Sequence, residues 1–128
     1  MSDFFHSRAR SFRYAFAGWW YVIRTQKNAW IHALASCSVF AMAAWLALPA
    51  RDWATLILTV AMVWMAEFIN TALEAVVDLS SPQMHPLAKV GKDVGAAAVL
   101  ISALAAVIVG LLLLGPPLVN QIRILLLH

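Results

Sequence analysis

The sequence contains little of several residue types, and each shortage excludes a class of protein. Cys37 is the only cysteine, so neither an intrachain disulfide framework nor a CxxC site is possible. Asp, Glu, Lys and Arg make up only 12% of the 128 residues, and no Pro/Gly/Ser-rich linker interrupts the chain, which predicts one domain over residues 1–128. No GxxxxGK[ST] loop, RNP motif or zinc finger is present, so we expect no P-loop and no nucleic-acid partner.

Apolar residues dominate the composition. Hydrophobic residues make up 63% of the chain, and three apolar segments run from Ile31 to Leu48, from Trp53 to Val77 and from Val94 to Leu114. Each approaches the length of about 20 residues that crosses the hydrocarbon core of a bilayer. The first 27 residues contain five basic side chains and no uninterrupted apolar h-region, so we expect no cleavable signal peptide. The prediction is an all-α membrane protein with three transmembrane helices.

Basic residues are divided unequally between the two sides of these spans. Seven lie before the first span or between the second and third, and two lie on the other side: Arg8, Arg10, Arg13, Arg24, Lys27, Lys89 and Lys92 against Arg51 and Arg123. The positive-inside rule then places the N-terminus and the loop over residues 78–93 in the cytoplasm. The net charge of +3 indicates affinity for anionic headgroups or phosphates.

The pattern over residues 4–27 predicts an amphipathic helix that lies on the membrane surface. Apolar side chains fall within about 60° of one face, and polar or small ones fall near the opposite face: Phe5, Phe12, Phe16, Trp19 and Ile23 against Arg10, Tyr14, Gly18 and Tyr21. One interpretation is a surface anchor whose arginines contact lipid phosphates. The other is a lid in which Arg10, Arg13 and Tyr14 cover a phosphate-bearing ligand. The pattern alone favours neither.

The stretch E-F-I-N-T-A-L-E-A-V-V-D, which begins at Glu67, places carboxylates at the end of the second span. Ionisable groups cost on the order of 2.5–3.5 kcal/mol each at mid-membrane, so these residues require a compensating function. At about 100° per residue, Glu67, Glu74 and Asp78 fall within roughly 40° of one another, and Asn70 lies about 60° to one side. Glu74 lies about 31 Å along the helix from Trp53, near the membrane surface, with Glu67 one to two turns deeper.

The third span carries small residues on one face and enters the cytoplasm beside Lys92 and Asp93. The small residues lie within about 80° of one another and permit close approach by another helix: Ala88, Gly91, Gly95, Ala98, Ser102 and Ala106. Gly115-Pro116-Pro117 is expected to end or kink this helix, and S-S-P-Q-M-H-P to form the turn before it. His32 is interpreted as a hydrogen-bonded structural residue rather than a metal ligand.

The cytoplasmic edge thus gathers carboxylates, an amide, a lysine and the arginines and tyrosines of the surface helix. Phosphoryl transfer needs this inventory: carboxylates to hold Mg²⁺, cations to neutralise phosphate oxygens, and a base to orient a hydroxyl. The spacing alone indicates a polar, membrane-embedded site. Besides phosphoryl transfer, it leaves open a proton or cation conductor and a non-catalytic lipid-binding or assembly protein.

E-F-I-N-T-A-L-E-A-V-V-D followed by H-P-L-A-K-V-G-K-D-V-G-A-A-A-V-L closely resembles the signature of the small prokaryotic membrane lipid kinases, which comprise diacylglycerol kinase and undecaprenol kinase. The resemblance covers the chain from about Arg10 to Leu114. It implies ATP- and Mg²⁺-dependent phosphorylation of undecaprenol or diacylglycerol in the bacterial inner membrane, by a homotrimer with shared sites. R-S-F-R-Y-A-F-A-G and N-A-W-I-H look more similar to the undecaprenol kinase branch.

The resemblance also implies a role for each residue that matches the signature. Glu67 would be the general base for the lipid hydroxyl and Glu74 a Mg²⁺ ligand. The residues that would support the metal and nucleotide or contact ATP are Asn70, Asp78, Lys92 and Asp93. Arg10, Tyr14 and Gly18 match further family positions near the nucleotide.

One position departs from the family pattern. Familiar members carry a second metal-binding Glu before the first span, and the corresponding residue here is Gln26 in T-Q-K-N. A glutamine offers a carbonyl oxygen but no charge, so the affinity for Mg²⁺ should fall unless another carboxylate compensates. Gln26 is therefore the second candidate metal ligand.

Overall fold

The computed structural model describes residues 2–81 and 85–127, with side chains from Arg8 onward in the first range. Four helices make up the described chain: α1 (Ser2–Thr25), α2 (Lys27–Trp45), α3 (Ala50–Ser80) and α4 (Pro86–Leu126). The predicted all-α fold is confirmed for these residues. The side chain of Phe5 and residues 82–84 of the predicted turn lie outside the described residues.

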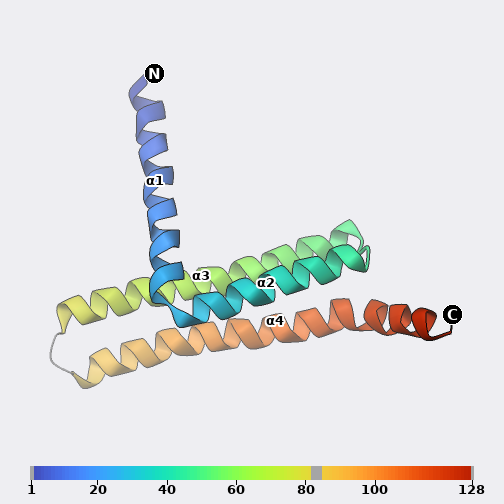
Figure 1. Cartoon of the computed structure of the whole chain (residues 1–128). Helices are drawn as coiled ribbons and strands as arrows, with labels where there is room; N and C mark the ends of the chain where they lie inside the picture. The colour runs from blue at the N-terminus through green and yellow to red at the C-terminus, as the bar shows by residue number, and fades with distance from the viewer. Residues whose placement is uncertain (1, 82–84, 128) are drawn as a thin grey trace.

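Three of the helices form a bundle and the first stands across it (Figure 1). α2 and α3 run antiparallel, joined by a tight turn in which Ala47 has a positive φ of 50° and Pro49 precedes the first residue of α3. α4 packs along α3, which is the most extensive helix pairing in the chain. By length and composition, α3 and α4 could each cross a membrane.

α1 meets the bundle through its C-terminal half, at the level of Trp64 and Phe68 on α3. Trp19 stacks on Trp64, with ring centroids 4.9 Å apart, and its ring lies edge-on to that of Phe68 at 5.0 Å. Val22 is buried in the same cluster, against Trp64 and Ala29 of α2. The C-terminal end of α3 and the first turns of α4 extend beyond α1 on one side, and the rest of the bundle lies on the other (Figure 1).

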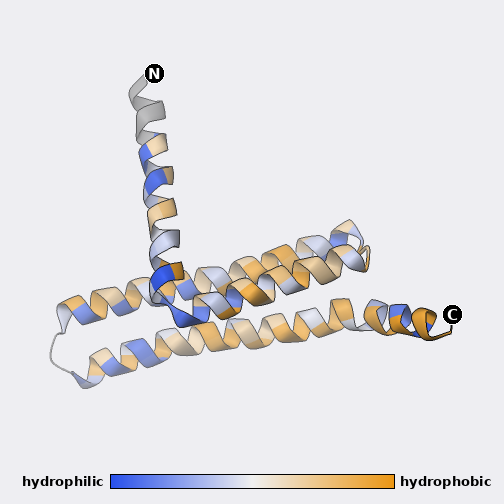
Figure 2. Cartoon of the chain, in the orientation of Figure 1, coloured by the Kyte–Doolittle hydropathy of each residue, from blue (hydrophilic) through white to orange (hydrophobic). Residues whose placement is uncertain are grey.

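The interior of the far end of the bundle is apolar. Ala43, Leu56 and Leu114 form a buried cluster there, and Phe40 stacks on Trp53 with ring centroids 5.8 Å apart. Hydrophobic residues also cover the outer surfaces of the bundle helices (Figure 2). An outer surface of this kind suits contact with lipid, because soluble monomers rarely expose large contiguous apolar areas.

α3 and α4 approach each other closely at Gly95. A Cβ atom built on Gly95 would overlap Oδ1 of Asn70 and would lie 3.2 Å from Leu73 Cδ2. At Gly91, one turn earlier, the nearest atom would be Val77 Cγ2 at 3.9 Å. The small-residue face predicted for the third span therefore permits close helix packing, and Gly95 is the position where it matters most.

The helix does not end at Gly115-Pro116-Pro117. α4 continues through both prolines to Leu126 and is 41 residues long. Each proline removes one intrahelical hydrogen bond, but the remaining backbone groups of an apolar segment are still best satisfied inside a helix. Of the two expected outcomes, the end of the helix is therefore wrong, and residues 118–126 belong to α4.

Candidate active site

Glu67 lies inside the bundle, with its side chain only 1% exposed. The nearest charged or titratable partner is His32 of α2, whose Nε2 lies 3.6 Å from Glu67 Oε2. Both atoms are buried and neither has a hydrogen-bond partner. The hydroxyl of Thr71 donates to the backbone carbonyl of Glu67 and therefore does not bond to the Glu67 carboxylate. A buried carboxylate without a hydrogen bond is costly to maintain.

The structure does not show the hydrogen-bonded structural role predicted for His32. Its Nε2 makes no hydrogen bond, and the imidazole faces the one carboxylate that the pattern identified as deepest. The ring also lies near that of Trp64, with centroids 6.2 Å apart. Its position at the predicted cytoplasmic edge of its span was a sequence signal that His32 could belong to the site. Only the register between α2 and α3, however, reveals that it faces Glu67.

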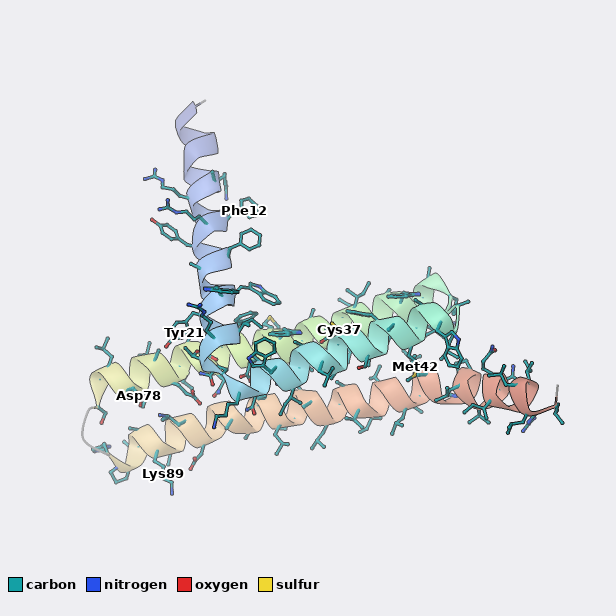
Figure 3. All side chains as sticks on the ribbon, in the orientation of Figure 1. Phe12, Tyr21, Cys37, Met42, Asp78 and Lys89 are labelled. Carbon is teal, nitrogen blue, oxygen red and sulfur yellow. The ribbon has the colours of Figure 1, made fainter. Side chains whose placement is uncertain are left out.

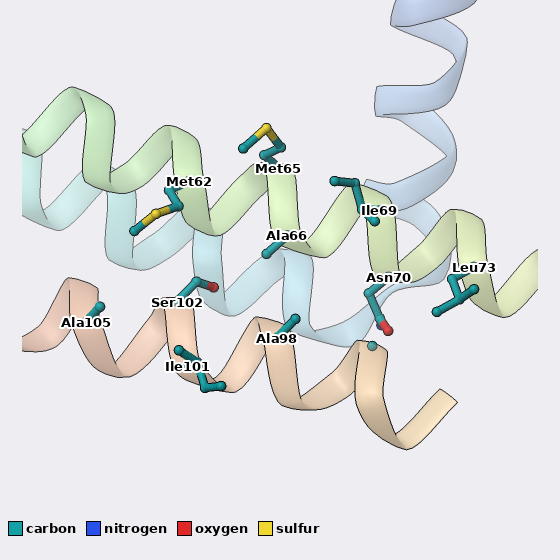
Figure 4. A pocket seen from close by; sticks show the side chains of 11 residues that line it. Met62, Met65, Ala66, Ile69, Asn70, Leu73, Ala98, Ile101, Ser102 and Ala105 are labelled. Carbon is teal, nitrogen blue, oxygen red and sulfur yellow. The ribbon is translucent and has the colours of Figure 1, made fainter. Parts of the chain in front are cut away.

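Asn70 and Glu74 are linked one turn further along α3. Asn70 Nδ2 donates to Glu74 Oε1 over 3.1 Å, and Glu74 is half-buried. The other polar atom of Asn70, Oδ1, is buried without a hydrogen-bond partner. Figure 4 shows the Asn70 side chain pointing toward α4, where Gly95 leaves room for it. The amide thus holds Glu74 in place from the interior of the bundle.

Asp78 and Lys92 pair with each other between α3 and α4. Lys92 Nζ donates to both carboxylate oxygens of Asp78, over 2.9 and 3.1 Å. This hydrogen bond, together with the negative charges of Asp78 and Glu74, raises the pKa of Lys92 above its usual value. Lys92 therefore stays cationic at neutral pH. Both residues were predicted at the nucleotide, and the structure joins them across the helix pair at the end where α3 and α4 extend beyond α1.

The remaining predicted residues lie on α1, on α4 and at the break between α1 and α2. Asp93 is exposed on α4, and Gln26 is half-buried at the break between α1 and α2, where it precedes α2 without a side-chain capping bond. The other three, Arg10, Tyr14 and Gly18, are exposed on α1. A Cβ built on Gly18 would meet nothing within 4 Å, so nothing within the described chain crowds this position.

Figure 3 shows how α1 presents its two faces. Phe12 lies on the side toward the Met42 end of the bundle, and side chains bearing nitrogen and oxygen lie on the opposite side, toward Asp78 and Lys89. This arrangement agrees with the predicted amphipathic pattern. The arginine guanidinium of Arg13 also lies 5.8 Å from the ring centroid of Tyr14.

The described residues contain no cluster of three or more His, Cys, Asp or Glu side chains that could hold a metal ion. Mg²⁺ is usually bound by one or two carboxylates together with substrate phosphates and water. The half-buried carboxylate of Glu74 fits that mode.

Comparison with known proteins places this sequence in a family. Residues 13–114 match the family described as prokaryotic diacylglycerol kinase. The chain belongs to this family. It is 50% identical over 111 residues to a diacylglycerol kinase of Synechocystis, an alignment that covers 86% of this chain and 63% of that protein. It is 38% identical over 109 residues to the undecaprenol kinase of Bacillus subtilis, covering 85% of this chain and 89% of that protein.

A further relative is the diacylglycerol kinase of Escherichia coli, 42% identical over 73 residues, or 57% of this chain and 60% of that protein. The chain thus spans less than two thirds of some curated relatives and most of another. Membership of the lipid kinase family, predicted from the residues around Glu67 and Lys92, is confirmed. Relatives carry both names, so the similarity to the undecaprenol kinase branch stays a prediction.

Proposed function

We propose that this protein phosphorylates a membrane lipid alcohol, diacylglycerol or undecaprenol, with ATP as the phosphate donor. The observation that carries the proposal is Glu67, a carboxylate whose side chain is only 1% exposed inside the bundle, in a chain of the lipid kinase family. A general base needs an oxygen atom that is available to a hydroxyl proton. Burying a carboxylate inside an apolar bundle is costly, so its presence there supports a functional role.

The position of α1 supports a site at the membrane surface. If the bundle crosses the bilayer, α1, which stands across it (Figure 1), lies along the membrane plane. α1 contacts α3 at Trp64 and Phe68, which bracket Glu67. Glu67 would then lie near the interface, where a lipid presents its hydroxyl, and Glu74 and Asp78 would face the cytoplasm. The N-terminus would be cytoplasmic, in the inner membrane of a bacterium.

An apolar groove gives the lipid chain a place beside this carboxylate. It lies between α2, α3 and α4, has a volume of about 500 Å³, and extends from His32 to Leu118. Its lining is almost entirely hydrocarbon, which suits an acyl or prenyl chain and does not suit a polar substrate. A chain in this groove would bring its headgroup to the level of Glu67.

Nucleotide and metal would bind on the cytoplasmic side of Glu67. Glu74, held by Asn70, and the neutral oxygen of Gln26 are the candidate ligands of Mg²⁺, which would neutralise charge on the phosphates of ATP. Lys92 would contact phosphate oxygens by sharing its ammonium group between ATP and Asp78. Asp93 and the exposed α1 residues Arg10, Tyr14 and Gly18 would complete the nucleotide site, because all four positions are exposed and open to a ligand.

The working unit that we propose is a homotrimer in which α2, α3 and α4 all cross the membrane and the whole chain forms one domain. A second cavity of about 450 Å³ opens between α3 and α4, lined by residues such as Met62, Ile69 and Ala98 (Figure 4). A neighbouring helix could fill this apolar cavity. It would also cover Asn70, and α1 residues of one chain could then reach the site of another.

The test is transfer of labelled γ-phosphate from Mg·ATP to diacylglycerol and to undecaprenol, in parallel, with purified protein in lipid-containing micelles. Glu67→Gln should abolish transfer and leave the folded oligomer intact, because glutamine fills the same space but cannot accept the proton. Asp52→Asn is the matched control, since it makes the same carboxylate-to-amide change at the far end of α3 and should leave the rate unchanged. Full activity of Glu67→Gln would refute the assigned base, and labelling of neither lipid would favour an assembly role.

A further inference from the structure

One side chain that faces Glu67 has no role in the function proposed above. His32 Nε2 on α2 lies 3.6 Å from Glu67 Oε2 on α3. Each of these atoms is buried without a hydrogen-bond partner. A shift of a few tenths of an ångström would bring them to hydrogen-bonding distance, and catalytic contacts often shorten only when substrate binds. The two side chains are therefore placed to act together.

The position of His32 is fixed by contacts between α2 and α3. Trp64 Nε1 donates to Ser36 Oγ over 3.2 Å, and the same hydroxyl donates to the backbone carbonyl of His32 over 2.6 Å. These bonds connect the turn that carries His32 to the residue three positions before Glu67. Ala29, three residues before His32, is fully buried against Trp64. The distance between the imidazole and the carboxylate is thus set by packing of the helix pair.

His32 lines the apolar groove, and Glu67 does not. The imidazole lines the groove between α2, α3 and α4, whereas Glu67 lines neither this groove nor the cavity between α3 and α4. A hydrogen-bond donor at Oε2 would leave Oε1 as the oxygen available to a substrate. Without a donor at Oε2, the carboxylate could rotate about its final torsion, which is broad for glutamate.

We propose that His32 is a positioning residue for Glu67, donating its Nε2 proton to Oε2 so that Oε1 is presented to the lipid hydroxyl. This inference rests on the kinase function proposed above. In the reaction, the lipid oxygen forms a bond to the γ-phosphorus of ATP and the bond from that phosphorus to the β,γ-bridging oxygen breaks. The hydroxyl proton passes to Glu67 Oε1 and ADP leaves. His32 keeps its own proton throughout, which distinguishes it from the base.

The test compares His32→Gln with His32→Met in the full-length protein. The two replacements have similar length and volume, but only glutamine can donate a hydrogen bond to Glu67. His32→Met should lower kcat about 100-fold, within the range for a misplaced base, with the KM for ATP unchanged. His32→Gln should stay within about tenfold of the native kcat, because its amide restores the donor. A purely structural role would instead change both variants together, along with their thermal unfolding.

A second measurement does not depend on activity. Nitrogen NMR of histidine-labelled protein reports which imidazole nitrogen carries the proton, and the His32 Nε2 signal should shift when Glu67→Gln removes the carboxylate. An unchanged signal would overturn the contact itself, whatever reaction the protein catalyses. A shifted signal with native kcat in His32→Met would overturn the positioning role. If the native protein labelled no lipid, the proposed function and with it the positioning role would fail, while the NMR result would still decide the contact.

Discussion

Replacing Gly95 by alanine should displace the side chain of Asn70 while leaving Asn70 itself unsubstituted. The new Cβ would overlap Asn70 Oδ1 and approach Leu73 Cδ2 at 3.2 Å. The least costly response is rotation of the Asn70 amide, since it is the end of a side chain and α4 backbone cannot move as easily. Rotation breaks the hydrogen bond from Asn70 Nδ2 to Glu74 Oε1. The substitution therefore tests whether Asn70 holds Glu74 for the metal and nucleotide.

The magnitude follows from two opposing contributions. A hydrogen bond to a charged group contributes about 1.5–3 kcal/mol, and the gain in helix propensity from glycine to alanine returns about 1 kcal/mol. The free energy of unfolding should then fall by roughly 0.5–2 kcal/mol. If the bond acts in the transition state, kcat/KM for Mg·ATP should fall roughly 10- to 150-fold, since about 1.4 kcal/mol corresponds to a factor of ten.

Gly91→Ala is the matched control for this measurement. Gly91 lies one turn earlier on α4, where a Cβ makes an ordinary contact at 3.9 Å, so this variant should keep native activity and equal or greater stability. Asn70→Ala completes a double-mutant cycle, because Gly95→Ala should add little once the amide is gone. Equal activity of the Gly95 and Gly91 variants, or additive effects in the cycle, would refute the reasoning.

Three further substitutions test other parts of the site. Lys92→Met should raise the KM for Mg·ATP severalfold with the fold intact, because it removes the cation beside Asp78. Lys89→Met is the control at an exposed lysine, and equal KM values for the two variants would contradict the assignment. Gln26→Glu should lower the Mg²⁺ concentration needed for half-maximal rate, and no change would show that residue 26 does not face the metal. Trp64→Ala should lower the free energy of unfolding by about 3–5 kcal/mol and expose the α1–α2 junction to limited proteolysis, whereas unchanged thermal unfolding would contradict its packing role.

Apolar runs and the positions of polar residues predicted the helices and the carboxylate stripe. The runs at residues 53–77 and 94–114 lie inside α3 and α4, and Glu67, Asn70 and Glu74 share a face as the helical period requires. The ends of the helices were less predictable. α4 passes through Pro116 and Pro117 because neighbouring apolar residues keep the helix favourable beyond them, and no local pattern records that balance.

The pairing of His32 with Glu67 could not be predicted, because it depends on the relative depth of α2 and α3. That depth is set by the turn at Ala47, whose positive φ is unusual for a residue with a Cβ, and by the hydrogen bond between Trp64 and Ser36. The direction of α1 could not be predicted either, because it also depends on a contact between distant residues. It results from the stacking of Trp19 on Trp64, a contact between residues 45 positions apart in the sequence.

The buried polar side chains of the bundle fall into two groups, those whose polar atoms have a hydrogen-bond partner and those with an atom that has none. The hydroxyls of Thr59, Thr71 and Ser102 each donate to a backbone carbonyl of their own helix, so they need nothing further. Among the described residues, the buried side-chain atoms without a partner are His32 Nε2, Glu67 Oε2 and Asn70 Oδ1.

Each unpaired buried atom costs about 1–3 kcal/mol, so a fold selected for stability alone would scatter or remove them. Instead, all three lie between α2, α3 and α4 near the level where α1 joins the bundle. That level is also where the apolar groove ends at His32, and where a lipid hydroxyl and a cytoplasmic phosphate could meet. The unused hydrogen-bonding capacity and the family membership are independent observations, and both support the proposal that the chemistry takes place at this level of the bundle.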